Sequence, residues 1–450
     1  MAAIVTDNLR LHQSELLLTE ILADADSDRY YIGIGKSDVY SSTDAAVDPV
    51  RSNQNERDVR HNLQSIKKVE AASIVIPRHN WSAGNKYSAW TDTSVGIPTN
   101  SYYVLTDINE VFIVIKASKN ASGEIQNSTV KPEVPAGANR AKPFELSDGY
   151  VWKFMYGLSA GKANSFLSAG FIPVQNIGTA SNAFETDQKA VQTAAVGGQV
   201  VGIEIESNGA GYSSTPTVTI RGNGSAAVAT ATVSGNQVTK VEMNNESAGL
   251  GSGYDFASVL FSGGSPSKPA KARAVLGPHA GLGFDARDDL KANSVMLNIK
   301  PDGTVSNTFI TGNDFRQIGL FKGMRKTDSA STGGIFTGTS SLALRSMKSA
   351  NASNLTIGRI ISDASTPKKK AFIDDISGTS IFYHQNDSTG FSVFDSGATI
   401  SDGIQTITVD SANISAAVNP YTGFLFYIDQ RAKILRADAQ QEDIKVILTV

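Results

Sequence analysis

Residues 197–277 carry an internal repeat, and this feature constrains the fold more than any other part of the chain. The matching segments are 199–205 with 237–243, 211–220 with 253–262, and 226–233 with 270–276. Each copy has the pattern of a strand, a Gly-Tyr turn, a second strand, a glycine-rich turn and a third strand. Strands this short cannot bury a hydrophobic face alone, so the two copies must pack on each other. The repeat therefore predicts a small β domain inserted into a larger chain.

Outside the repeat, short runs of β-branched and aromatic residues predict further strands. These runs cover residues 29–35, 72–77, 102–105, 111–115, 149–156 and 294–299, several short segments between 371 and 409, and residues 423–428 and 443–450. Residues 107–110 have the composition of a hairpin turn. Residues 117–147 are rich in Ser, Asn, Pro and Gly, which predicts a long surface loop.

Three segments have the pattern of helices. Residues 6–26 carry leucines near helical spacing, and Thr6 or Asp7 can cap the N-terminus. Residues 55–70 are predicted to be a second, amphipathic helix, and residues 160–168 a short third one. The apolar stripe of the second helix is formed by Val59, Leu63, Ile66 and Val69.

Changes in composition divide the chain into five segments. A chain of 450 residues has room for about two to four domains. The segments are 1–195 and 278–330 as scaffold, 196–277 as the inserted repeat domain, 331–416 as a second inserted small β domain, and 417–450 as C-terminal scaffold strands. The expected fold class is mainly β with a few helices (α+β), built from several sandwich-like or barrel-like β modules.

Charge and cysteine content exclude several classes of protein. The net charge is −3 and the longest basic run, at residues 368–370, is short, so we expect no nucleic-acid partner. There is no cysteine, which excludes disulfides, thiolate metal sites and cysteine nucleophiles. The N-terminus lacks the pattern of a signal peptide, and no apolar run reaches the roughly 18–20 residues of a membrane helix. We therefore expect a soluble protein with no membrane partner.

Two motifs resemble catalytic or nucleotide-binding patterns but lack the required context. Residues 157–161 fit a nucleophile elbow around Ser159, yet neither downstream histidine is marked as its partner, and a helix cap at Ser159 is the simpler reading. Residues 33–37 end like a phosphate-binding loop, but Tyr30 stands where that loop requires glycine. We expect no catalytic residue, no cofactor and no metal ion.

Glycines and paired carboxylates elsewhere have structural explanations. Residues 249–253 resemble part of a dinucleotide-binding loop, but they lie in an all-β repeat with no following helix, so we interpret them as turn glycines. The adjacent pairs Asp288 with Asp289 and Asp374 with Asp375 would face opposite ways on a strand, and we predict solvated turn positions for them. A calcium ion bound in such a loop stays open as an alternative.

Five segments, in order along the chain, resemble the baseplate wedge subunit of T-even-type contractile-tailed phages. They are residues 31–40, 75–81, 147–156, 313–320, and 423–431 running on to 441–450. The resemblance covers about half of the chain. Residues 197–277 and 326–416 fall outside it and resemble inserted β modules of phage tail proteins. The resemblance implies a mainly β, multi-domain structural protein that is not an enzyme.

The resemblance also implies where the protein acts and what it binds. Wedge subunits are homodimers that contact other wedge and tail proteins, so the expected location is the tail baseplate of the virion, assembled in the host cytoplasm. The residues carried over are structural or interface candidates: Pro77, Arg78, Trp81, Asp148, Gly149, Tyr150, Trp152, Phe315 and Arg316. We expect Asp148 and Gly149 to form a tight turn before Tyr150. The planar forks of Arg78 and Arg316 are expected to hold carboxylates or backbone carbonyls.

Two other functions stay open at this point. The first is a carbohydrate-binding tail or adhesin protein that contacts glycans through residues 196–277. The second is a hydrolase that uses Ser159 as its nucleophile. Trp81, Trp90 and Trp152 could stack on sugars or bases, but tryptophans more often fill a core or a protein interface, which is the role we predict here.

Overall fold

The computed structural model describes residues 3–25, 29–94, 96–244, 249–301, 309–327, 333–437, 440 and 442–450. Its described part is mostly β, with 38% strand, 12% helix, five helices and several antiparallel sheets. The predicted fold class, mainly β with a few helices in several modules, is confirmed. Each of the five predicted segments has a part outside the described residues: 1–2, 26–28 and 95 in 1–195, 245–248 in 196–277, 302–308 and 328–330 in 278–330, 331–332 in 331–416, and 438, 439 and 441 in 417–450.

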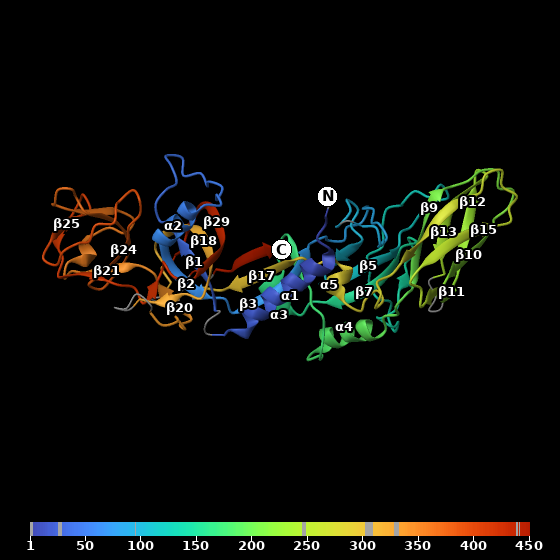
Figure 1. The fold of residues 1–450 in the computed structure, drawn as a ribbon, viewed down its shortest axis with the longest axis horizontal. Coiled ribbons are helices and arrows are strands. Elements are labelled where there is room, and N and C mark those ends of the chain that lie inside the picture. The colour runs from blue at the N-terminus through green and yellow to red at the C-terminus, as the bar shows by residue number, and fades with distance from the viewer. Residues whose placement is uncertain are drawn as a thin grey trace. The chain divides into compact units, whose positions relative to one another are not determined.

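The chain divides into two compact units (Figure 1). Unit 1 comprises Met1–Glu15, Ser73–Met296 and Leu448–Val450, and unit 2 comprises Leu16–Ala72 and Leu297–Ile447. Helix α1 (Asp7–Ala23) and strands β3 (Ala71–Pro77), β17 (Ser294–Ile299) and β30 (Ile444–Thr449) contain the residues at which the chain passes from one unit to the other. Among the described residues, no helix has both the length and the apolar content needed to span a bilayer.

A four-stranded antiparallel sheet in unit 1 has the order β4-β5-β7-β6. Its strands are β4 (Tyr103–Leu105), β5 (Glu110–Lys116), β6 (Phe144–Glu145) and β7 (Val151–Gly157). The predicted hairpin turn joins β4 to β5, with Asn109 at φ +60°. Alternating large side chains such as Phe112, Trp152 and Phe154 are buried together in one core. Helices α3 (Ala160–Phe166) and α4 (Ala183–Thr193) follow in the chain.

A second sheet has the order β30-β17-β3-β8, where β8 covers Phe171–Pro173. Strand β3 pairs with β8 so that Ile76 lies opposite Ile172. The short helix α5 (Ala286–Asp289) precedes β17 and is capped by Asp285, which accepts a hydrogen bond from the backbone N–H of Arg287. The two-stranded pair β19 (Arg325–Lys326) and β28 (Val418–Asn419) belongs to unit 2.

The two copies of the sequence repeat exchange strands with each other. Their strands are β9 (Val200–Ser207), β10 (Thr217–Gly222), β11 (Ser225–Ala227), β12 (Ala229–Ser234), β13 (Gln237–Met243), β14 (Leu250–Ser252), β15 (Ala257–Ser262) and β16 (Lys271–Leu276). The first strand of each copy pairs with the last strand of the other, in the pairs β9–β16 and β13–β12. The middle strands β10 and β15 pair directly. Each copy therefore supplies strands that pair with strands of the other, in line with the expectation that the two copies pack together.

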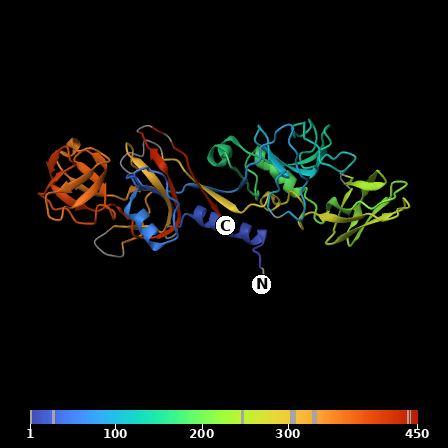
Figure 2. The same cartoon turned by 90° about the horizontal axis from the view of Figure 1, so that it is seen from above.

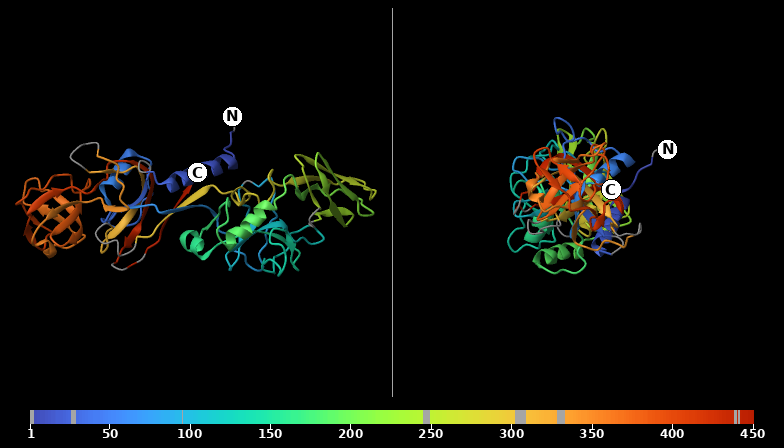
Figure 3. Two further views of the ribbon diagram at one scale, coloured as in Figure 1. Left: turned by 90° about the horizontal axis from the view of Figure 1, so that it is seen from below. Right: turned by 90° about the vertical axis from the view of Figure 1, so that its left-hand side faces the viewer.

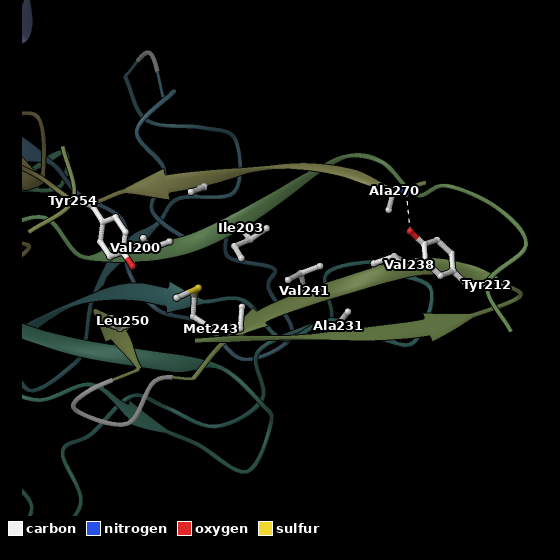
Figure 4. Close-up of a cluster of buried hydrophobic side chains, with 12 residues drawn as sticks. Val200, Ile203, Tyr212, Ala231, Val238, Val241, Met243, Leu250, Tyr254 and Ala270 are labelled. Carbon is white, nitrogen blue, oxygen red and sulfur yellow. Dashed lines mark hydrogen bonds between the residues drawn. The ribbon is translucent and has the colours of Figure 1, made fainter. Parts of the chain in front are cut away.

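Each copy places its Gly-Tyr tyrosine on a glycine of the other copy. The two tyrosines lie at opposite ends of the shared core (Figure 4), with Val200, Ile203 and Val241 between them. Tyr212 packs on Gly264, and its hydroxyl accepts a hydrogen bond from the backbone N–H of Ala270 at 2.8 Å. Tyr254 packs in the same way on Gly222 and Gly224. The repeat therefore has an approximate internal two-fold symmetry.

Unit 2 contains a five-stranded antiparallel sheet with the order β20-β2-β1-β18-β29. Its strands are β1 (Tyr30–Gly35), β2 (Leu63–Lys68), β18 (Asp314–Lys322), β20 (Ser340–Leu342) and β29 (Phe424–Leu435). Segments from the two ends of the chain, β1 and β29, therefore belong to one sheet, on either side of β18. Strand β29 is at the edge of this sheet.

The predicted helix over residues 55–70 is only half correct. Helix α2 (Asn53–His61) begins at the cap Ser52 and ends at Asn62, and the next residues form strand β2. Strand β2 lies between β1 and β20 and is almost wholly buried, so Leu63 and Ile66 are apolar because they are in the core on a central strand. A short buried run cannot be assigned to helix or strand by periodicity alone, and here the pairing with two neighbouring strands decides it.

A seven-stranded sheet with the order β26-β25-β22-β23-β24-β21-β27 lies within residues 345–414 of unit 2. Its strands are β21 (Arg345–Lys348), β22 (Ile360–Asp363), β23 (Lys370–Ser377), β24 (Ser380–His384), β25 (Thr399–Ser401), β26 (Thr406–Thr408) and β27 (Ser411–Ile414), with a 3₁₀ turn at Ala352–Asn354. The strands curl around a small core that includes Met347, Ile373 and Phe394 (orange in Figure 2). This small β domain falls in the segment predicted as the second insert.

Candidate functional site

Asp148 and Gly149 form the turn that leads into β7. Gly149 has φ +83°, a conformation that glycine adopts without strain, and its N–H donates to the carbonyl of Leu146. The carboxylate of Asp148 accepts hydrogen bonds from the hydroxyl of Ser128 and from the backbone N–H groups of residues 129, 130 and 150 at 2.9–3.2 Å. This one side chain therefore ties the loop before β6 to the start of β7.

The Asp148→Ala variant is expected to lose about 2 kcal/mol of unfolding free energy, because several donors to a charged acceptor lose their partner at once. Urea unfolding followed by tryptophan fluorescence reports on this site, since Trp152 lies nearby on β7. Asp148→Asn keeps one acceptor oxygen and should lose less. Glu133→Ala, an exposed carboxylate in the same loop, should leave the midpoint unchanged. Equal midpoints for Asp148→Ala and Glu133→Ala would contradict the role of the turn.

The turn delivers two aromatic residues into the interior of unit 1. Tyr150 and Trp152 are fully buried and stack at 5.7 Å between ring centroids, and Tyr87 packs edge-on against both. The hydroxyl of Tyr150 donates to the carbonyl of Gln126 at 2.6 Å, and burial raises its pKa. Trp81 is partly exposed and donates from Nε1 to the hydroxyl of Ser128. The aromatic cluster is a core, and its rings are not arranged as an exposed stacking platform.

Pro77 and Arg78 join β3 to its surroundings in unit 1. The hydroxyl of Tyr103 donates to the carbonyl of Pro77 at 2.6 Å. Arg78 donates from Nη1 to the carbonyl of Ser168 and from Nε to Oδ1 of Asn80, each at 2.8 Å. Its fork therefore holds a backbone carbonyl and a side-chain amide.

Phe315 and Arg316 lie on β18 in unit 2, and both are buried. Arg316 forms a two-pronged ion pair with Asp44, from Nε at 2.8 Å and from Nη2 at 2.6 Å. Its Nη1 donates to the carbonyl of Ser37. The hydrogen bond from Arg316 holds the pKa of Asp44 below its usual value. Arg316 thus fixes the segment that follows β1 onto the sheet.

The structure explains the glycine and serine motifs locally. Ser159 caps α3 by accepting a hydrogen bond from the backbone N–H of Lys162, as the simpler reading predicted. Gly251 and Gly253 have φ of +66° and +73°, which confirms that they are turn glycines. Ser37, at the end of the segment that resembled a phosphate loop, donates its hydroxyl proton to Asp374.

The prediction of solvated turn positions is wrong for two of the paired aspartates. Asp289 is only 3% exposed, and its Oδ2 accepts from the N–H of Gly283 at 2.7 Å. Burial raises its pKa to about 8. Lys153 on β7 is also buried, donates to the carbonyl of Ala141, and has its pKa lowered by burial to about 8. The tertiary packing that buries these groups leaves no trace in the local sequence.

Asp374 is completely buried and forms the centre of a polar network in unit 2. Its Oδ2 lies 2.7 Å from Nδ1 of His384, and its Oδ1 accepts hydrogen bonds from Gln64 and Ser37 at 3.0 Å. Asp374 and His384 belong to the small β domain, on β23 and β24, whereas Gln64 is on β2. The network therefore joins the small β domain to the five-stranded sheet. The ring of His384 also stacks on Phe372 at 5.1 Å.

Sequence reasoning missed this network, although one signal was present. Asp374 and His384 directly follow two predicted strands, 371–373 and 380–383, that are close in the sequence, so a hairpin register would have placed them near one another. In the structure Phe372 pairs with His384 across that hairpin. Gln64 and Ser37 come from far away in the sequence and carried no comparable signal.

Strand β29 presents an apolar surface at the edge of the five-stranded sheet. Phe424 and Phe426 are 71% and 58% exposed, and their ring centroids lie 6.4 Å apart. Tyr30 on β1 stacks on Phe426 at 6.0 Å. We call these three side chains the β29 surface. Within the described residues, β29 pairs with β18 and with no second strand.

Seven of the nine candidate residues lie in unit 1, and Phe315 and Arg316 lie in unit 2. Gly149 and Trp81 are partly exposed. Tyr150, Trp152, Phe315 and Arg316 are buried, so each stabilises the unit to which it belongs. No protein-family model matches the chain, and no curated protein sequence matches it.

Proposed function

We propose that this chain is a structural subunit, not an enzyme, of the baseplate wedge of a contractile phage tail. In this proposal it forms a homodimer and binds other wedge and tail proteins, and it acts by holding and rearranging protein interfaces. The β29 surface is the observation that carries the proposal, because two large exposed aromatic side chains at a strand edge are a feature of protein-binding surfaces.

The location of the resembling segments supports the proposal. Residues 31–40 begin on β1, residues 313–320 lie on β18, and residues 423–431 lie on β29. These three strands are neighbours in the five-stranded sheet, with blue β1 and red β29 on either side of β18 (Figure 3). Three of the five segments that resemble the family thus meet in the sheet whose edge carries the exposed aromatic residues, whereas residues 75–81 and 147–156 lie in unit 1.

The energetics favour a partner at this edge. Burying an exposed phenylalanine contributes about 1.5–3 kcal/mol, so Phe424 and Phe426 can supply the centre of an interface. The backbone of an edge strand adds unpaired N–H and C=O groups that a second strand can satisfy. A stable dimer buries about 1,600 Å² in total, and the twelve residues of β29 offer a long edge for that contact.

We expect the purified chain to be a dimer of the 47.6 kDa protomer in size-exclusion chromatography with light scattering. The double variant Phe424→Ser, Phe426→Ser should be monomeric, because it removes the apolar centre of the interface. Phe256→Ser is the matched control, since Phe256 is 64% exposed but lies in the repeat. It should stay dimeric.

Two results would contradict the proposal. One is a wild-type chain that is monomeric at all concentrations and is absent from purified tails when antibodies against it are used for gold labelling. The other is a double variant that dimerises as well as the Phe256→Ser control. The alternative function, glycan binding through residues 196–277, stays a prediction from the sequence.

A further inference from the structure

A cavity of about 210 Å³ lies in unit 2, next to the Asp374–His384 network. It is partly open and is lined by strands β21 and β24 of the small β domain, by the end of α2, and by the segment around β28. Typical pockets for drug-sized ligands have volumes of about 300–1,000 Å³, so this cavity suits a smaller molecule with a single ring.

His384 lines this cavity, and in the protonated ring its Nε2 is a hydrogen-bond donor that the fold leaves unused. Its side chain is 2% exposed, and Nδ1 is bonded to Asp374. In the described part of the chain, Nε2 is buried and has no hydrogen-bond partner. A buried polar atom without a partner costs about 1–3 kcal/mol, which a ligand atom at this position would recover.

The charge of the cavity wall is positive. Arg345 and Arg60 line it together with His384, and none of the lining residues is an aspartate or glutamate. Arg60 is fixed, because it donates to the carbonyls of residues 420, 422 and 423, whereas Arg345 is exposed. Burial raises the pKa of Tyr383 and Tyr421, and the positive charge of Arg345 opposes the rise at both.

Three rings form an apolar wall on the same cavity. The ring of His61 lies 4.6 Å from Phe391 and 5.6 Å from Tyr421, between ring centroids. Phe391 and Tyr421 are both about half exposed, and burial lowers the pKa of His61, which favours its neutral form. Rings of this kind provide faces and edges on which another ring can pack.

We propose that the cavity binds a small carboxylate that carries one ring. Its carboxylate pairs with the guanidinium of Arg345 and accepts a hydrogen bond from Nε2 of His384, and its ring packs against Phe391 and Tyr421. A neutral molecule of the same shape would leave the positive groups without a partner. This inference does not depend on the proposed dimer, because no cavity residue belongs to the β29 surface.

Benzoate and D-glucuronate are suitable probes, with benzamide and D-glucose as neutral molecules of similar shape. Isothermal titration with the full chain should show saturable binding of at least one carboxylate, with a Kd on the order of 1 mM or tighter, and at least about tenfold weaker binding of its neutral counterpart. Binding of benzoate alone would identify a planar aromatic acid, and binding of glucuronate alone would identify a sugar acid.

Arg345→Gln should weaken the binding of that carboxylate at least about tenfold, because it removes the exposed cation of the wall. Lys348→Gln is the matched control, since Lys348 is an exposed cation on the same strand that does not line the cavity, and its Kd should stay within about twofold of the wild type. His384→Gln tests the buried donor, and its folding is checked by circular dichroism. Absence of saturable binding of both acids up to about 20 mM, or unchanged affinity in Arg345→Gln, would overturn the proposal.

Discussion

Replacing Asp374 with alanine is expected to lower the unfolding free energy of unit 2 by about 3–5 kcal/mol. The substitution removes the partner of Nδ1 of His384 and the acceptor for Gln64 and Ser37 in a place that water does not reach. The loss of one partner in a buried pair is costly because the other is left without compensation. The small β domain and the five-stranded sheet would then lose the network that joins them.

Hydrogen exchange measured by mass spectrometry at increasing urea concentrations suits this test. All three tryptophans lie in unit 1, so fluorescence would not report on unit 2, whereas peptides from β2, β23 and β24 report on it directly. Asp375→Ala is the control, because Asp375 is the neighbouring carboxylate and is partly exposed. We expect these peptides to lose their protection from exchange at a much lower urea concentration in Asp374→Ala than in Asp375→Ala. Loss of protection at the same urea concentration in both variants would refute the prediction.

The pH dependence of the same peptides provides a second measurement. Burial by itself lowers the pKa of His384, but the attraction of the Asp374 carboxylate and the hydrogen bond that His384 donates to it outweigh burial and raise the pKa above the ordinary value of 6.5. The ionisable groups that act on this pKa are Asp374 on β23, which contacts the ring, and Asp38 and Lys36 after β1, and His384 in turn acts on the pKa of His61 at the end of α2.

A raised pKa in the folded state sets the direction of the effect. The stabilisation by protonated His384 is complete below about pH 6.5 and is lost as the pH rises through the higher pKa of the folded protein. Unit 2 should therefore open at lower urea above that pKa than at pH 6. His384→Gln should remove this dependence, and a wild-type protein that becomes more stable over this range would contradict the assignment.

The sequence predicted the features that depend on local pattern. Alternation within the repeat, the Gly-Tyr turns and the hairpin after β4 all follow from backbone preferences of a few neighbouring residues, and the structure has them. The second half of the predicted helix at 55–70 failed because β2 is a central strand, buried by partners that are distant in the sequence. Local periodicity cannot describe a residue whose surroundings come from elsewhere in the chain.

The polar sites also fall into those that the local sequence predicts and those that depend on distant residues. Asp148 was identified because its turn and the following aromatic strand are adjacent in sequence. Asp374 was assigned to solvent because a pair of acidic residues is usually exposed, and its true partners Gln64 and Ser37 are supplied by other strands. Buried ionisable groups require tertiary contacts to be stable, so a single sequence without an alignment cannot reveal them.

The second large effect concerns the glycines on which the tyrosines of the repeat pack. In Gly222→Ala, the added Cβ would lie 2.1 Å from the carbonyl oxygen of Phe256 and 2.8 Å from the ring of Tyr254. In Gly264→Ala, it would lie 2.6 Å from the carbonyl oxygen of Ser214 and 2.7 Å from the ring of Tyr212. Such contacts force the backbone or the ring to move. We therefore expect each substitution to lower the unfolding free energy of the repeat domain by about 3 kcal/mol or more.

Gly235→Ala is the control that distinguishes the effect of steric contact from the effect of an unfavourable backbone conformation. Gly235 has φ +60° in the same domain, but the space that a Cβ would occupy is open. Gly235→Ala should therefore lower the unfolding free energy by only about 1 kcal/mol, because the substitution makes only the backbone conformation unfavourable. Gly264 has both the contact and a positive φ of +74°, whereas Gly222 has the contact alone. Hydrogen exchange of peptides from β9 to β16 should therefore rank the losses as Gly264→Ala at least equal to Gly222→Ala, and both well above Gly235→Ala. Each tyrosine packs on a glycine of the other copy, so Gly222→Ala or Gly264→Ala should increase hydrogen exchange in peptides of both copies together. Faster exchange in only one copy would disprove the shared core.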